Sequence, residues 1–187
     1  MYKIPASVFE SINDYGNDKE KSVLHVLTPM RISVNNEFFP RIPKKNHKAV
    51  RTALGLTKPA TIEFTDDEMM VHDKQGNVAR TEKMSDFNFV QFGAIRTMPI
   101  APPAYTYSMT MVIGVQERFY YVLNPNFMVF QRLSPLLKQQ GVTVEDPFDI
   151  ASLPSNEERE NYFNKFYVER IKGTNYPLQL KWMPFLI

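Results

Sequence analysis

The chain has no cysteine among its 187 residues. This absence excludes disulfide bonds, thiolate nucleophiles and cysteine-bound zinc. Only seven glycines are present, and none falls in a phosphate-binding or dinucleotide-binding pattern. The serines also lack the context of a nucleophile elbow. We therefore expect no catalytic motif and no cofactor.

Long apolar runs are missing as well. Residues 1–15 lack the basic flank and continuous apolar run of a signal peptide, and no later stretch reaches a membrane-spanning length. We expect a soluble, cytoplasmic protein. The composition, 43% hydrophobic and 22% charged, is that of an ordinary globular chain, and the length suits a single domain over residues 1–187.

Charge is nearly balanced, with a formal net charge of +2, but it is unevenly distributed. Every ionised side chain in residues 41–58 is basic, whereas residues 145–160 are mainly acidic. A helix over residues 44–54 would place Lys44, Lys48 and Arg51 on one face, with Lys45 beside them. The basic segment is the candidate anion-binding site, and an ordinary solvated helix face is the favoured alternative.

Residues 60–141 carry the clearest fold signal, because six candidate strands follow one another without a helical pattern between them. Such a series favours antiparallel neighbours joined by hairpins. The strongest pair is the alternating stripe of Met109, Met111, Ile113 and Val115, followed after a polar turn by Phe119, Tyr121 and Leu123. Upstream, residues 23–34 predict two short strands or one strand broken at Pro29.

The strand series ends in a predicted helix. Asn124 has the character of an N-cap, Pro125 suits the first helical position, and apolar residues then recur at helical spacing up to Gly141. Pro135 predicts a kinked or broken helix, with Ser134 and Pro135 as the possible start of a second one.

A last helix is predicted from Ser155, which forms a capping-box pattern with Glu158, to Gly173. Its aromatic stripe is expected to be core rather than a ligand site, and an apolar tail from Leu178 is expected to dock as a final strand. The stripe comprises Tyr162, Phe163, Phe166, Tyr167 and Ile171.

The fold class expected is therefore α+β: an antiparallel curled sheet or partly open barrel closed by a helix. The core is residues 60–141. Residues 1–59 and 142–187 form helical N- and C-terminal extensions packed on it.

This order of elements resembles the pleckstrin-homology-like fold, especially its small bacterial versions. In that fold a strand like residues 61–65 precedes an acidic turn and a second strand, here 69–73. A polar, glycine-containing turn follows, here 74–77, and a helix like 127–140 ends the barrel. The resemblance covers less than half of the chain and implies a binding or scaffolding module. Because residues 61–73 are acidic, it does not imply recognition of lipid headgroups.

The candidate chemistry is sparse. The three histidines, His25, His47 and His72, have no metal-ligand spacing, so no metal site is expected. Asp66, Asp67 and Glu68 are close to His72 in sequence, but a solvated turn is the favoured interpretation because such carboxylates share one environment.

Three hypotheses for function remain open. The first is a non-enzymatic module that binds protein or peptide partners or associates with itself through an apolar, proline-rich loop. The second is binding of acidic membrane or nucleic acid by the basic segment. The third is a small-molecule pocket inside the sheet, lined by Met109, Met111, Phe119 and Tyr121. The interaction-loop residues of the first are Met98, Pro99, Ile100, Pro102, Pro103 and Tyr105.

Overall fold

The fold is α+β and contains two sheets. The computed structural model describes residues 22–26, 30–34, 37–38, 61–73, 75–97, 105–124 and 127–178. Residues 1–21 of the expected helical N-terminal extension lie outside this part of the chain. The predicted helix over residues 44–54 and the predicted tail strand beyond Leu178 also lie outside it.

The first sheet has the strand order β1–β9–β8–β7–β10. Three long strands form an antiparallel meander at its centre, and each outer strand is parallel to its neighbour. The strands are β1 (Ser22–Val26), β7 (Phe87–Thr97), β8 (Thr106–Val115), β9 (Arg118–Asn124) and β10 (Val144–Glu145).

The second sheet has the order β3–β2–β4–β5–β6. Its last three strands also form an antiparallel meander, while β2 is parallel to β4. The strands are β2 (Met30–Val34), β3 (Glu37–Phe38), β4 (Thr61–Phe64), β5 (Glu68–His72) and β6 (Val78–Lys83).

The six strands predicted within residues 60–141 are confirmed as β4 to β9. The prediction of one curled sheet is wrong, because the chain changes sheets between β6 and β7. The short helix η2 (Met84–Asp86) makes this change, with Met84 buried and its N–H donated to the Asp67 carbonyl over 2.7 Å. The described strands therefore form two sheets and no closed barrel.

The hairpin of β8 and β9 turns at Gln116 and Glu117, as predicted. Met111 lies opposite Val122, and Val112 lies opposite Tyr121. Residues directly opposite each other in an antiparallel pair point to the same side of the sheet. The hairpin therefore has a face with Met111 and Val122 and another face with Val112 and Tyr121.

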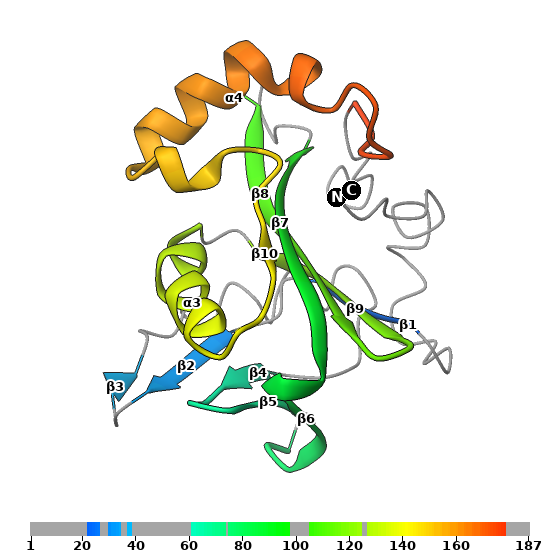
Figure 1. The fold of residues 1–187 in the computed structure, drawn as a ribbon. Coiled ribbons are helices and arrows are strands. Elements are labelled where there is room, and N and C mark those ends of the chain that lie inside the picture. Colours follow the sequence, from blue (N-terminus) through cyan, green and yellow to red (C-terminus); the bar gives the residue numbers. More distant parts are fainter. Residues whose placement is uncertain are drawn as a thin grey trace.

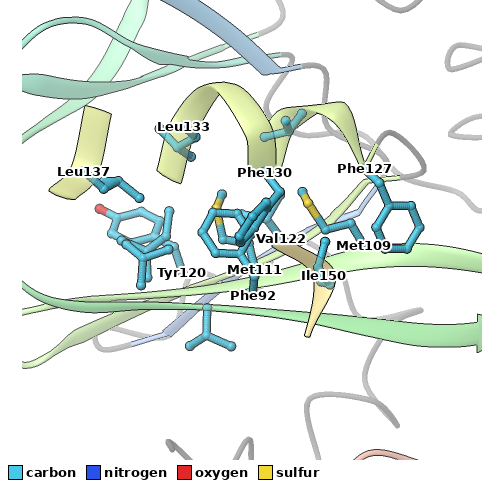
Figure 2. Packing of buried hydrophobic residues seen from close by; sticks show 14 of the residues in the cluster. Phe92, Met109, Met111, Tyr120, Val122, Phe127, Phe130, Leu133, Leu137 and Ile150 are labelled. Carbon is cyan, nitrogen blue, oxygen red and sulfur yellow. The ribbon is translucent and has the colours of Figure 1, made fainter. Parts of the chain in front are cut away.

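Helix α3 (Met128–Gln139) covers the Met111 face, and Figure 2 shows this packing. Phe130 of the helix lies edge-on to Phe92 of β7, with ring centroids 4.8 Å apart. Leu133 and Leu137 occur at helical spacing on the same buried side. The apolar face predicted for this helix is thus confirmed, and it closes the core over the sheet.

Two details of the α3 prediction are wrong. Asn124 is the last residue of β9, opposite Met109, and the helix begins at Met128 rather than after Asn124. A broken helix is also wrong, because one continuous helix runs through Pro135, while the alternative of a kink there stays a prediction. Proline has no N–H, so the carbonyl of Gln131 loses its usual partner in the helix. Gln131 and Pro135 are both exposed, so water can solvate that carbonyl.

Helix α4 (Asn156–Arg170) lies at the upper end of β7 and β8 in Figure 1. Its predicted capping box is confirmed: Ser155 Oγ accepts the Glu158 N–H, and the Glu158 carboxylate accepts the Ser155 N–H. Gly173 has a φ of 77°, a value that favours glycine, and it lies just beyond the helix end as predicted. Neither described helix is long and apolar enough to cross a membrane.

The chain after α4 returns to the first sheet. Tyr176 is buried, and its hydroxyl shares a 2.9 Å hydrogen bond with Thr110 of β8. The Tyr167 hydroxyl donates to the Pro177 carbonyl over 3.1 Å. Side-chain hydrogen bonds thus attach the segment after α4 to the helix and to the sheet.

Candidate functional site

Most residues of the predicted binding segments lie outside the described part of the chain. This holds for Lys44, Lys45, Lys48 and Arg51 of the basic segment, and for Met98, Pro99, Ile100, Pro102 and Pro103 of the proline-rich loop. Both sites remain predictions.

Tyr105 is the one predicted loop residue that the structure describes. Its side chain is 39% exposed, and the Arg96 guanidinium lies 4.2 Å from the centre of its ring. Arg96 itself is buried and donates from Nε to the Leu178 carbonyl over 3.0 Å. The base of the proline-rich loop therefore presents an aromatic surface at the end of β7 and β8.

The acidic turn and His72 are at opposite ends of the β4–β5 hairpin. Asp66 and Asp67 are exposed in the turn, which is closed by the 2.9 Å bond from Thr65 N to Glu68 O. His72 instead has Nε2 3.1 Å from Glu63 Oε2. A solvated turn is what the structure shows, and the described residues contain no group of three metal-ligating side chains.

The four residues predicted to line a pocket in the sheet do not share one face. Met109 and Met111 are fully buried under α3, among the side chains of Figure 2. Phe119 and Tyr121 lie on the other face of the sheet, where their rings stack at 6.4 Å. These side chains therefore do not surround one cavity, and the small-molecule hypothesis stays a prediction.

A cleft does occur beside α4. It has a volume of about 500 Å³ and is open to solvent. We call it the α4 cleft. Its lining comes from the end of α4, from the turn after α4 and from the loop after β10: Pro147, Tyr162, Phe166, Glu169, Arg170, Lys172 and Thr174.

The α4 aromatic stripe explains why this cleft is lined by rings. Phe163 and Tyr167 are fully buried and pack against Tyr107 of β8, with centroid distances of 5.3 and 5.6 Å. Tyr162 and Phe166 are each one residue earlier, about 100° around the helix, and remain half-buried. The stripe is too wide for one buried face, so part of it forms the cleft.

The two cleft rings are adjacent, with centroids 5.2 Å apart. Arg170 lies over Tyr162 at 5.5 Å, and Lys165 lies over Phe166 at 5.0 Å. Arg170 also approaches Asp149 at 3.9 Å, but both groups are well exposed, so this ion pair contributes little. The cleft thus combines apolar ring surface with cationic hydrogen-bond donors.

The Tyr162 hydroxyl is buried and has no hydrogen-bond partner. A buried, unsatisfied hydroxyl costs about 1–3 kcal/mol. Because the hydroxyl is buried while the residue as a whole is half-buried, the part of Tyr162 that the cleft presents is its ring.

Asp146 fixes the loop that contributes Pro147 to the lining of the cleft. Its carboxylate accepts the backbone N–H groups of Ile150 and Ala151, each over 2.9 Å. Burial raises the pKa of Asp146, while these two N–H groups act in the opposite direction. The resulting closed turn holds Pro147 at the rim of the α4 cleft.

Sequence analysis did not identify this cleft. The prediction that the stripe is core is correct for Phe163 and Tyr167, which are buried. Tyr162 and Phe166 are only half-buried. The width of the aromatic stripe could have indicated the cleft. Aromatic residues at two adjacent positions in successive helical turns cannot all point inward.

No family model, curated protein or solved structure matches the chain. The chemistry of the α4 cleft is therefore the basis for a functional proposal.

Proposed function

We propose that the protein is a binding module that recognises a protein or peptide segment in the α4 cleft. The observation that supports this most is the pair of half-buried rings, Tyr162 and Phe166, beside Arg170 in an open cleft of about 500 Å³. Tyrosine and arginine are enriched among the residues that dominate binding energy at protein interfaces. Ligand pockets commonly have volumes of roughly 300–1,000 Å³.

The site is suited to an extended segment more than to a compact ion. Its cations, Arg170 and Lys172, are accompanied by Glu169 and by nearby Asp149, so the local charge is mixed. The end of α4 also carries the negative end of the helix dipole, which disfavours an isolated anion. A peptide backbone offers carbonyl acceptors to the cations and N–H donors to the carboxylates, while its side chains cover the rings.

The resemblance to the pleckstrin-homology-like fold agrees with this proposal. We assign the antiparallel strands β4 to β9 followed by α3 to that fold as part of the proposal. The resemblance implies binding or scaffolding rather than a particular ligand, so it adds to the cleft chemistry without selecting the partner.

Selection from a random peptide display library tests the proposal. Peptides recovered on the native protein should bind at least tenfold more weakly to Phe166→Ser, since loss of a central aromatic typically costs about 2 kcal/mol or more. Val168→Ser is the matched control, because Val168 is also on α4, is 50% exposed and does not line the cleft. Recovery of no peptide, or equal loss in both variants, would refute the proposal.

A further inference from the structure

We infer that the ligand of the α4 cleft is the proline-rich segment, residues 98–104, of a second copy of this chain. This inference rests on the proposed function, since it names the partner of the same cleft. It commits to self-association, with a closed dimer as the simplest product.

The sequence of the segment has the chemistry of a polyproline ligand. Pro99 and Pro102 are three residues apart, and Pro103 follows directly. A polyproline II helix has about three residues per turn, so Pro99 and Pro102 would share one side of it. The carbonyls of a polyproline II helix have no internal hydrogen bonds, and proline has no N–H, so in this conformation the segment would offer unpaired acceptors.

The α4 cleft is complementary to these properties. Proline rings pack on aromatic faces, and the cleft supplies two adjacent rings, Tyr162 and Phe166, at 5.2 Å. Its cationic donors, Arg170 and Lys172, match the carbonyl acceptors that such a helix would offer. A proline-rich ligand has few donors of its own, and among the described residues that line the cleft Glu169 is the single carboxylate.

The base of the segment is close to α4 in the same molecule. Thr97 ends β7 and Thr106 begins β8, so residues 98–104 connect the two strands. Tyr107, immediately after this connection, packs on Phe163 and Tyr167 and donates its hydroxyl to Asn164 over 3.0 Å. The described residues that flank the segment and the α4 cleft thus lie at one end of the molecule, as a two-fold dimer with reciprocal exchange requires.

Surface exposure at the base supports an interface there. Tyr105 and Leu178 are 39% and 55% exposed, and Arg96 contacts both, at the Tyr105 ring and the Leu178 carbonyl. Large apolar side chains exposed together are typical of interaction surfaces. The segment would therefore enter the partner's cleft from a surface that already presents apolar groups.

Sedimentation equilibrium of the full chain over a range of concentrations tests the inference. We expect a reversible dimer whose dissociation constant rises about tenfold or more in Pro99→Ala/Pro102→Ala and in Phe166→Ser, with Val168→Ser unchanged. Arg170→Gln, at an exposed position, provides a second cleft variant should Phe166→Ser fold poorly. In parallel, a labelled peptide of residues 97–106 should bind the native chain more tightly than a scrambled peptide of equal composition.

The outcomes separate this inference from the proposed function. A strict monomer, or a dimer insensitive to both the loop and the cleft variants, overturns the inference. If library peptides without proline still bind at the cleft, the proposed function survives that result. A monomer that binds the 97–106 peptide also contradicts the inference, because the second copy would then not be the partner.

Discussion

Gly93 of β7 lies directly under the side chain of Tyr176. A Cβ at Gly93 would be 2.2 Å from the Tyr176 hydroxyl oxygen and 2.7 Å from Thr110 Oγ1. The missing side chain therefore makes room for a phenol hydroxyl on the face of the sheet. This contact attaches the chain that leaves α4 to β7 and β8, and so helps to place the end of the α4 cleft.

Gly93→Ala should destabilise the protein by about 1–3 kcal/mol, the usual cost of overpacking a filled interior. Chemical denaturation would measure this loss. In a Tyr176→Ala background the same change should cost less, because the closest clash is removed and only the one with the small Thr110 side chain remains. Equal costs in the two backgrounds would show that Gly93 and Tyr176 are not coupled.

Stability should fall between pH 10 and pH 12 through Tyr176. Burial raises its pKa from 10.0 to about 12, opposed by its hydrogen bond with Thr110. Above pH 10 the unfolded chain loses this proton while the folded chain keeps it, so the stabilisation present below pH 10 is lost as pH rises, by about 3 kcal/mol in total.

Burial raises the pKa of Tyr167 as well, so the effect of Tyr176 has to be isolated. The difference in unfolding free energy between the native chain and Tyr176→Phe does this across the pH range. A difference that is independent of pH from 9 to 12 would contradict the assignment.

Ser155→Ala should lower stability by about 1 kcal/mol, because it removes the acceptor for the Glu158 N–H at the start of α4. Thermal unfolding followed by circular dichroism would detect the change. Ser85→Ala is the comparison, since Ser85 is exposed in η2. Equal effects of the two substitutions would argue against the capping box.

Pro135→Ala should stabilise the protein by about 1–2 kcal/mol. Alanine restores the N–H that the helix interior lacks, and its helix propensity is about 3 kcal/mol more favourable than that of proline. The unfolded chain becomes more flexible without proline, which offsets part of this gain in the free energy of unfolding. Pro135 is exposed, so little packing is lost. A lower midpoint of urea unfolding would show instead that the proline ring makes contacts that α3 needs.

Local sequence pattern was sufficient for the strands within residues 60–141. Alternation of apolar and polar residues depends only on the two faces of a strand, so β4 to β9 were predictable one by one. Their division between two sheets was not, because η2 redirects the chain through the buried side chain of Met84 and a tertiary hydrogen bond to Asp67.

Parallel partners and the start of α3 also depend on distant contacts. The pairing of β1 with β9 joins segments about a hundred residues apart, and no local pattern encodes it. Asn124 and Pro125 have good helix-start chemistry, yet Asn124 completes the β8–β9 ladder opposite Met109. Tertiary hydrogen bonding thus outweighs a local capping preference.

Identification of the α4 cleft needs both the sequence pattern and the tertiary structure. The sequence shows aromatic residues in adjacent positions over two turns of α4, which identifies a helix with more apolar surface than one face can bury. It does not show that Pro147 and Thr174, from outside the helix, complete a cleft around Tyr162 and Phe166.

The absence of cysteine allows the central claim to be tested at one position. An environment-sensitive dye on Glu169→Cys would report from the α4 cleft, and the same dye on Val168→Cys would report from outside it on the same helix. On titration with library-selected peptides and with the 97–106 peptide, we predict a saturable emission change at position 169 and none at 168. No change at 169, or equal changes at both positions, would contradict a binding site in the α4 cleft.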